Sequence, residues 1–299
     1  MKSVLILGST GMLGYGVLSC MVKYKNIKIG ASVRSKKTLR KVKKNFPYNK
    51  VDKFHIFDVL NFKDKELNEL VKNYDFIINC IGIIKPEINI SNTISLKNAI
   101  FINSVFPNLL ADTTLNKKIK IFQIATDCVY SGRLGKYNEK SEHDDTDIYG
   151  VTKSLGEIKK KNFFNLRTSI IGREYSSKKS LLEWFLNHKN KSTLNGFENH
   201  YWNGLTTNTF GEIIYTIIEN NLKIPNTFHI VPKDTINKYD LLQIFNKKFN
   251  TKYKIEKFRT QKKIDRSLKT VYKKKLNQIW KLSKFKSQPS IKDMINQTI

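Results

Sequence analysis

A tyrosine and a lysine stand four residues apart in the run Tyr149-Gly150-Val151-Thr152-Lys153. On a helix these two side chains would share one face. A nearby ammonium stabilises a phenolate, so we expect Lys153 to lower the pKa of Tyr149 toward neutrality. Such a tyrosine could act as a general acid in one direction of a reaction and as a general base in the other. The pair is informative only through its position, because the chain contains 47 lysines.

A threonine stands 23 residues before that tyrosine, at the end of an apolar run over 119–125. The hydroxyl of Thr126 could donate a hydrogen bond to a substrate carbonyl oxygen as negative charge develops there. The alternative is that Thr126 only caps the next turn. Cys128 follows two residues later, and we interpret it as a small packed side chain and not as a nucleophile.

Three glycines, Gly8, Gly11 and Gly14, follow the apolar run 2–7 and precede a segment with helical spacing. In a strand–turn–helix unit such glycines let the backbone approach a pyrophosphate at the helix N-terminus. The alternative is that they serve turn geometry alone. Arg34 lies 20 residues after Gly14, and no acidic residue occurs between Gly14 and Lys50. A base here accommodates the 2′-phosphate of NADP, so the pattern favours NADPH over NADH. Arg34 could otherwise be one more surface base.

These residues need a scaffold of alternating strands and helices, and the first 171 residues show that pattern. We expect strands over 2–7, 27–33, 53–57, 75–81, 119–125 and 164–171. Helical spacing occupies 12–23, 36–44, 63–72, 96–115 and 149–161. This alternation predicts an α/β protein with a Rossmann-type doubly wound parallel sheet.

The pattern becomes irregular after residue 171. Helices are expected over 180–188, 209–221 and 238–249, and strands over 226–231 and 253–258. We predict a dinucleotide-binding domain over 1–171, to which 207–235 contributes. A smaller C-terminal α/β substrate-binding subdomain would comprise 172–206 and 236–299 and pack over the carboxyl ends of the strands.

The chain is strongly basic, with 54 Lys and Arg against 25 acidic residues and a net charge of +29. Only 7 of these bases are arginines, the residue that nucleic-acid readers favour. We therefore expect a solvated basic surface and no nucleic-acid partner. No apolar run approaches the length of about 20 residues that a membrane span needs. Three widely spaced cysteines fit a reducing compartment, so we expect a cytoplasmic protein. The histidines show no metal-ligand spacing, and we interpret the acidic run 142–147 as a solvated loop.

Three motifs together resemble the extended short-chain dehydrogenase/reductase family. They are the glycine turn, the run Thr126-Asp127-x-Val129-Tyr130-x-Gly132 and the run Tyr149-Gly150-x-Thr152-Lys153-x-x-Gly156-Glu157. The threonine–aspartate run is similar to that of dTDP-4-dehydrorhamnose reductase-like sugar-nucleotide reductases. The resemblance implies NADPH-dependent reduction of a nucleotide-linked 4-keto-6-deoxy sugar for surface polysaccharide or deoxysugar biosynthesis. It also allows a homodimer.

The resemblance implies roles for individual residues. The catalytic residues would be Thr126, Tyr149 and Lys153. The cofactor-binding residues would be Gly8, Thr10, Gly11, Met12, Leu13, Gly14, Arg34, Asp58, Val59, Cys80, Ile81, Gly82, Asn103 and Lys153. The substrate-binding residues would be Asp127, Arg167, Trp202 and Arg266, with Arg266 pairing with the pyrophosphate. No metal site is expected.

One departure leaves the sugar open. After Arg167-Thr168-Ser169 the chain continues with Ile170-Ile171-Gly172, where the rhamnose enzymes tend to carry a tryptophan. Two alternatives to a reductase also remain. The same apparatus serves nucleotide-sugar epimerases, and a related regulatory subunit keeps the dinucleotide fold without catalysis.

Overall fold

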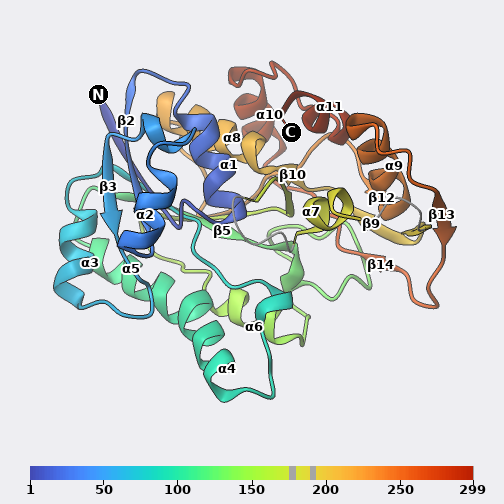
Figure 1. Cartoon of the computed structure of the whole chain (residues 1–299), viewed down its shortest axis with the longest axis horizontal. Helices are drawn as coiled ribbons and strands as arrows, with labels where there is room; N and C mark the ends of the chain where they lie inside the picture. Colours follow the sequence, from blue (N-terminus) through green and yellow to red (C-terminus); the bar gives the residue numbers. More distant parts are fainter. Residues whose placement is uncertain (175–179, 189–192, 299) are drawn as a thin grey trace.

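A computed structural model describes residues 1–174, 180–188 and 193–298 of the chain, and Figure 1 shows the fold. Its centre is a seven-stranded sheet with the strand order β11-β6-β5-β4-β1-β2-β3. All neighbouring strands of this sheet run parallel. The strands are β1 (Lys2–Leu7), β2 (Ile27–Val33), β3 (Lys53–Ile56), β4 (Phe76–Asn79), β5 (Lys120–Ala125), β6 (Phe163–Arg167) and β11 (Thr227–His229).

Helices cover both faces of the sheet, and β1 shows how the sequence divides them. Val4 and Ile6 pack into one hydrophobic cluster with α1 (Met12–Met21) and α8 (Thr207–Glu219). Leu5 and Leu7 point into a second cluster with α3 (Asp64–Val71) and α5 (Phe106–Thr114). Alternate side chains of a strand point to opposite faces, so a continuous apolar run fills both layers. The predicted doubly wound α/β fold is confirmed.

The segment predicted as one helix over 96–115 is interrupted. It comprises α4 (Thr93–Ile100), a π-helical turn (Phe101–Val105) and α5. The π-helical turn carries Asn103, and such turns often occur at functional sites. The predicted helix 149–161 is also shorter, because α6 spans Ile148–Leu155. Gly156 follows it, and a Cβ there would lie 2.0 Å from the carbonyl oxygen of Asn103.

The predicted strand 164–171 is two strands. β6 ends at Arg167, and β7 (Ile170–Ile171) pairs with β10 (Leu205–Thr206) outside the main sheet. The chain then returns to the main sheet through α8 and β11. The helices α1 and α8 pack closely, since a Cβ on Gly16 would lie 2.1 Å from the Thr207 hydroxyl oxygen.

A smaller region lies at the right of Figure 1. Its three-stranded sheet places β9 (His200–Trp202) between β12 (Ile236–Asn237) and β14 (Ile264–Asp265). A second pair joins β8 (Leu194–Phe197) to β13 (Ile255–Phe258). The accompanying helices are α7 (Leu181–Leu186) and α9 (Lys238–Phe249). Part of the predicted subdomain 172–206 lies outside the described residues.

Three further helices complete the fold. The short α2 (Lys36–Val42) follows β2, as predicted. The helices α10 (Lys273–Leu282) and α11 (Ile291–Thr298) were not predicted, and both contact α8. Each of these two helices buries a few apolar side chains, and Trp280 of α10 is fully buried. Among the residues that the structure describes, no helix is both long and apolar enough to cross a bilayer.

Candidate active site

The strand order reverses at β1, whose neighbours are β2 on one side and β4 on the other. In doubly wound sheets ligands bind at the carboxyl ends of the strands beside such a switch point. The glycine turn follows the carboxyl end of β1 here, and the segment that begins with Cys80 follows the carboxyl end of β4. The two segments touch, because the Cys80 amide donates a hydrogen bond to the Leu7 carbonyl over 3.1 Å. The turn predicted to bind the pyrophosphate and the segment predicted to line the cofactor therefore lie together.

The glycines beside this switch point fall into two groups. Gly8 has φ of +72°, and a Cβ on Gly14 would lie 2.2 Å from the Gly8 carbonyl oxygen. Protein geometry alone therefore requires both glycines. At Gly11 and Gly82 an added Cβ would meet no protein atom closer than 3.6 Å and 3.5 Å, respectively. All other glycines of the chain, which lie within the described ranges, are more tightly enclosed. Internal packing therefore does not explain these two glycines.

The N-terminus of α1 fits a phosphate group. Its N-cap residue is Gly11, and no side chain of the described residues caps the helix there. The first amide groups of a helix lack intrahelical acceptors and attract anions. Thr10 and Met12 are half-buried at this turn, whereas the Leu13 side chain is buried in the core. Only the backbone of Leu13 is therefore free to contribute to ligand binding.

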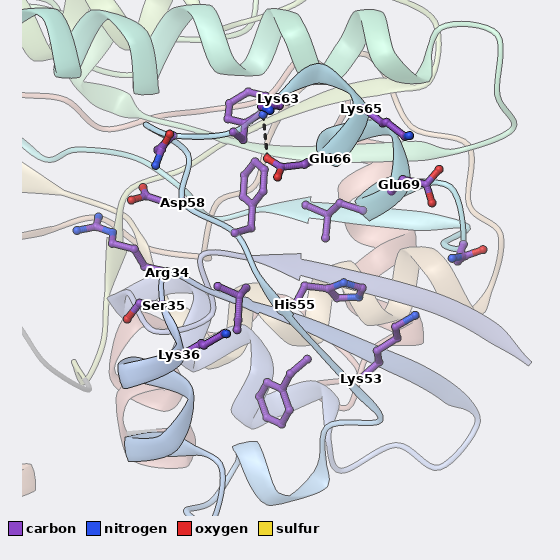
Figure 2. Close-up of a pocket in the computed structure, with 17 residues that line it drawn as sticks. Arg34, Ser35, Lys36, Lys53, His55, Asp58, Lys63, Lys65, Glu66 and Glu69 are labelled. Atoms are coloured by element: carbon purple, nitrogen blue, oxygen red, sulfur yellow. Dashed lines mark hydrogen bonds between the residues drawn. The ribbon is translucent and has the colours of Figure 1, made fainter.

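Figure 2 shows a cavity along β3 and α3, next to the segment that follows β2. This cavity of about 1020 Å³ is lined by Arg34, Ser35, Lys36 and Asp58, together with residues of β3 and α3. Figure 2 places Arg34, Ser35 and Asp58 at one end of this cavity and Lys53 at the other. Val59, which was predicted beside Asp58, has its side chain buried in the core.

The predicted catalytic residues gather after β5. Thr126 is the N-cap of a 3-10 turn (Asp127–Val129), and its hydroxyl oxygen accepts a hydrogen bond from the Cys128 amide over 3.1 Å. Thr126 therefore caps the turn, which was the alternative role considered for it. Its side chain is also hydrogen-bonded to that of Tyr149. Lys153 reaches the same strand, because its ammonium donates to the Ile124 carbonyl over 2.8 Å.

The expected coupling of Lys153 to Tyr149 is wrong for this structure. Burial raises the pKa of Tyr149, and the neighbouring Cys128 and Asp127 raise it further, whereas the hydrogen bond with Thr126 lowers it. The Lys153 ammonium is directed to the backbone of β5. Burial lowers the pKa of Lys153 to about 8, although Glu157 and Cys80 oppose that change. Tyr149 is therefore protonated at neutral pH, as a general acid must be. The sequence pattern did not reveal that both groups are buried.

Asn103 connects two segments of the candidate site by hydrogen bonds. Its amide oxygen accepts from the Ile83 amide over 3.0 Å, and its nitrogen donates to the Ile83 carbonyl over 3.1 Å. The same nitrogen donates to the Thr152 hydroxyl over 3.2 Å. Asn103 thus ties the segment after β4, which holds Cys80, Ile81 and Gly82, to the catalytic helix α6. Direct contact between its amide and a cofactor would require some of these bonds to open.

Asp127 and Cys128 lie beside Thr126. Asp127 is 7% exposed, and its carboxylate accepts from the Thr126 hydroxyl over 3.3 Å. Burial raises the pKa of Asp127, and the positive charges of Arg266 and Lys238 oppose this change. Burial likewise raises the pKa of the Cys128 thiol to about 12, so it is not a thiolate nucleophile.

Arg167 needs a correction, because the structure gives it a supporting position. It is only 2% exposed. Its guanidinium forms an ion pair with Glu157, donates to the Tyr130 hydroxyl over 2.7 Å and contacts His143 over 2.9 Å. These bonds commit the Arg167 guanidinium to protein partners. It braces α6 and the catalytic loop against β6.

Trp202 also differs from the expectation. Its ring is 4% exposed, and its indole nitrogen donates to the Ser169 hydroxyl over 2.8 Å. This burial leaves little ring surface for a sugar. Arg266 lies at the site as predicted, but its guanidinium already pairs with Asp145 over 2.7 Å and donates to the Tyr130 carbonyl over 2.7 Å.

The acidic run 142–147 is an irregular loop in which Glu142, His143, Asp144 and Thr146 are exposed, as expected, although three of its carboxylates also have protein partners. Asp144 accepts from the backbone and side chain of Ser131, Asp145 pairs with Arg266 and Asp147 pairs with Lys85. Their partners Ser131, Arg266 and Lys85 lie in three different segments of the chain. Across the described ranges no three His, Cys, Asp or Glu residues gather as a metal site would require.

One residue near the site was missed from the sequence. Lys238 begins α9 and carries its charge close enough to Asp127 and Cys128 to act on both. It is far along the chain from them and is one of 47 lysines. No local signal could have distinguished it.

A parallel sheet with a glycine turn at its switch point and a threonine, tyrosine and lysine after β5 defines a Rossmann-fold protein with a short-chain dehydrogenase/reductase type of site. The chain belongs to the family described as RmlD substrate binding domain, whose family model matches residues 1–298. The predicted family is therefore confirmed. No curated protein matches the chain.

Solved structures share this fold at low identity. A dTDP-4-dehydrorhamnose reductase from Clostridium acetobutylicum is 19% identical with a TM-score of 0.71, and the match covers 99% of this chain and 98% of that one. The Bacillus anthracis dTDP-4-dehydrorhamnose reductase in complex with NADP is 16% identical with a TM-score of 0.70, covering 100% and 98%. A UDP-glucuronic acid 4-epimerase from Bacillus cereus, in complex with UDP-glucuronic acid and NAD, is 15% identical with a TM-score of 0.71, covering 99% and 98%.

Proposed function

We propose that this protein is an NADPH-dependent reductase of a nucleotide-linked 4-keto-6-deoxy sugar. The observation that carries the proposal is the group formed by Thr126, Tyr149 and Lys153 after β5, beside the glycine-lined crevice. Membership of the RmlD substrate binding domain family supports the same class of substrate. Surface polysaccharide or deoxysugar biosynthesis would use the product.

Bound NADPH would supply the hydride for reduction of the sugar ketone. The Thr126 hydroxyl would orient the ketone oxygen by a hydrogen bond. Tyr149 holds its proton firmly, because burial raises its pKa, and would deliver that proton to the same oxygen. The Lys153 ammonium would turn from the Ile124 carbonyl toward the cofactor ribose.

The residues of the crevice fit a dinucleotide. Gly11 and Gly82 leave room that the protein itself does not fill. Arg34 and Lys36 line the cavity beyond β2, where the 2′-phosphate of NADPH would lie. The NADP complex of the Bacillus anthracis relative supports this choice over NADH.

The decisive experiment follows NADPH oxidation with a panel of dTDP-, UDP- and GDP-linked 4-keto-6-deoxy sugars. Wild type and Tyr149→Phe are compared, with NADH as the second cofactor. Oxidation that requires one particular sugar and is lost in the variant would support the reductase. Tight NADPH binding without any oxidation would contradict it.

An epimerase is the second candidate, because a UDP-glucuronic acid 4-epimerase shares the fold at a TM-score of 0.71. Cofactor stoichiometry distinguishes the two. A reductase consumes one NADPH per product, whereas an epimerase returns its cofactor unchanged. Product analysis by NMR would then identify the inverted carbon.

We further propose that the enzyme works in the cytoplasm, as a homodimer and without a nucleic-acid partner. The region around β9 would act as its substrate subdomain. Light scattering after gel filtration tests the dimer. A duplex-binding assay over a range of salt concentrations tests the nucleic-acid claim, because purely electrostatic binding weakens steeply with salt.

A further inference from the structure

Lys238 stands at a position that strand pairing determines. It follows β12, which runs antiparallel to β9 with Asn237 opposite Tyr201. Asn237 caps the start of α9, since its side chain accepts from the Asp240 amide over 2.8 Å. The Lys238 ammonium lies 5.6 Å from the centre of the Trp202 ring, a cation–π distance. The lysine is therefore held by regular structure and not by a loose loop.

The Lys238 ammonium lies near an aromatic ring and near the charges of two other side chains. Its charge acts on Asp127 and Cys128, which places it beside the turn that Thr126 caps. Within 1–174, 180–188 and 193–298, no hydrogen bond or ion pair holds this ammonium. The side chain is partly buried. Withdrawing an ammonium from water without giving it an acceptor is unfavourable, so a ligand that supplies one would be bound there.

Arg266, in contrast, has its positive charge neutralised by the Asp145 carboxylate. It follows β14, which pairs with the other edge of β9, so Lys238 and Arg266 approach β9 from opposite sides. Arg266 pairs with Asp145 and also donates to the Tyr130 carbonyl. Of these two bases beside the catalytic turn, Lys238 is the one without a protein acceptor among the described residues.

We propose that Lys238 is a substrate-anchoring residue that binds an oxyanion of the substrate beside Thr126 and Tyr149. This inference rests on the proposed function, because it takes the substrate to be a nucleotide sugar. Every nucleotide sugar carries a diphosphate, whereas a sugar carboxylate occurs only in a uronic acid, the kind of substrate named for the epimerase relative, and not in a 4-keto-6-deoxy sugar. Either would accept hydrogen bonds from the ammonium and neutralise its charge.

The test is calorimetric titration of the full chain, saturated with NADPH, with four ligands. dTDP against thymidine isolates the diphosphate, and UDP-glucuronic acid against UDP-glucose isolates the sugar carboxylate. The proteins are wild type, Lys238→Met, Lys238→Arg and Lys247→Met. Lys247 is an exposed residue of the same helix and provides the matched control. Lys238→Gln serves as a second neutral variant if Lys238→Met does not fold.

We expect Lys238→Met to weaken binding of the anionic member of one pair by about 10- to 100-fold, because a hydrogen bond to a charged group contributes about that factor. The uncharged member of that pair should bind as before. Lys238→Arg should keep most of the affinity, and Lys247→Met all of it. The pair that responds identifies the diphosphate or the carboxylate as the anchored group.

Two results would overturn the assignment. If wild type prefers the anionic ligands and the Lys238 variants keep that preference within about twofold, Lys238 does not bind the oxyanion, and the proposed function still stands. If wild type binds none of the four ligands, both the Lys238 assignment and the nucleotide-sugar function are overturned.

Discussion

The two ends of the candidate site are built by different means. Most of the proposed cofactor region consists of backbone, glycines and strand ends within the first 82 residues. The proposed substrate side contains charged side chains from distant segments, namely Asp127, Asp145, Lys238 and Arg266. A turn geometry is encoded locally, whereas a charge cluster exists only after folding. Local sequence therefore predicts the cofactor-binding turn, but it does not predict which charged side chains gather around a substrate.

The proposed catalytic group is Thr126, Tyr149 and Lys153, and loss of its proton donor should have the largest effect. Tyr149→Phe removes the proton donor and should lower turnover about 100-fold or more, because general acid catalysis contributes about 10²–10⁴-fold. Steady-state NADPH oxidation with the identified sugar measures this. Circular dichroism and NADPH affinity should stay as in wild type. A loss smaller than about tenfold would contradict the role of Tyr149.

The buried ion pair between Arg167 and Glu157 should be costly to break. Arg167→Met leaves the Glu157 carboxylate buried without its partner, and should lower the free energy of unfolding by about 3–5 kcal/mol. Urea denaturation measures the change. The double variant Arg167→Met with Glu157→Gln should recover part of the loss. If Arg167→Met is as stable as wild type but binds substrate poorly, Arg167 contacts the substrate after all.

The two groups of glycines provide a matched test within the cofactor crevice. Gly14→Ala places a Cβ against the Gly8 carbonyl and should cost about 1–3 kcal/mol of stability. Gly11→Ala meets no close protein atom, so we expect a stability change within about 0.5 kcal/mol and weaker NADPH binding. Thermal unfolding and NADPH titration separate the effects. Unchanged NADPH affinity in Gly11→Ala would show that the ligand does not approach there.

The smallest effect concerns Lys153 and pH. Burial lowers its pKa to about 8, so between pH 8 and the ordinary lysine value the unfolded chain binds more protons than the folded protein. Stability should therefore rise with pH in this window, by at most about 1.4 kcal/mol per pH unit. Urea denaturation at several pH values measures the slope. Lys153→Met should lack this contribution, and an identical slope in that variant would assign it to other groups.

Strand and helix order was predictable because the apolar runs and their spacing are local. The elements 27–33 and 238–249 agree with β2 and α9 at both ends. The interruptions were not predictable. The π-helical turn at Asn103 and the early end of α6 depend on contact between the segment after β4, α5 and α6, which a single stretch of sequence does not contain.

The site shows the same division. Thr126, Tyr149 and Lys153 were identified from residue type and position, and the structure brings them together. Arg167 and Trp202 carry suitable chemical groups, but burial commits both to protein partners. Lys238 could not be predicted as a site residue, since nothing near it in the sequence relates it to Asp127.

The sequence by itself determined the doubly wound α/β sheet, the glycine turn and the residues proposed for catalysis. Each of these depends on hydrophobic periodicity or on residue types at short spacing. Only the tertiary structure decided which charges are neutralised and which remain available. Burial and charge pairing depend on distant segments, so they set the pKa of Tyr149 and of Lys153, withdraw Arg167 and leave Lys238 without a protein acceptor among the described residues.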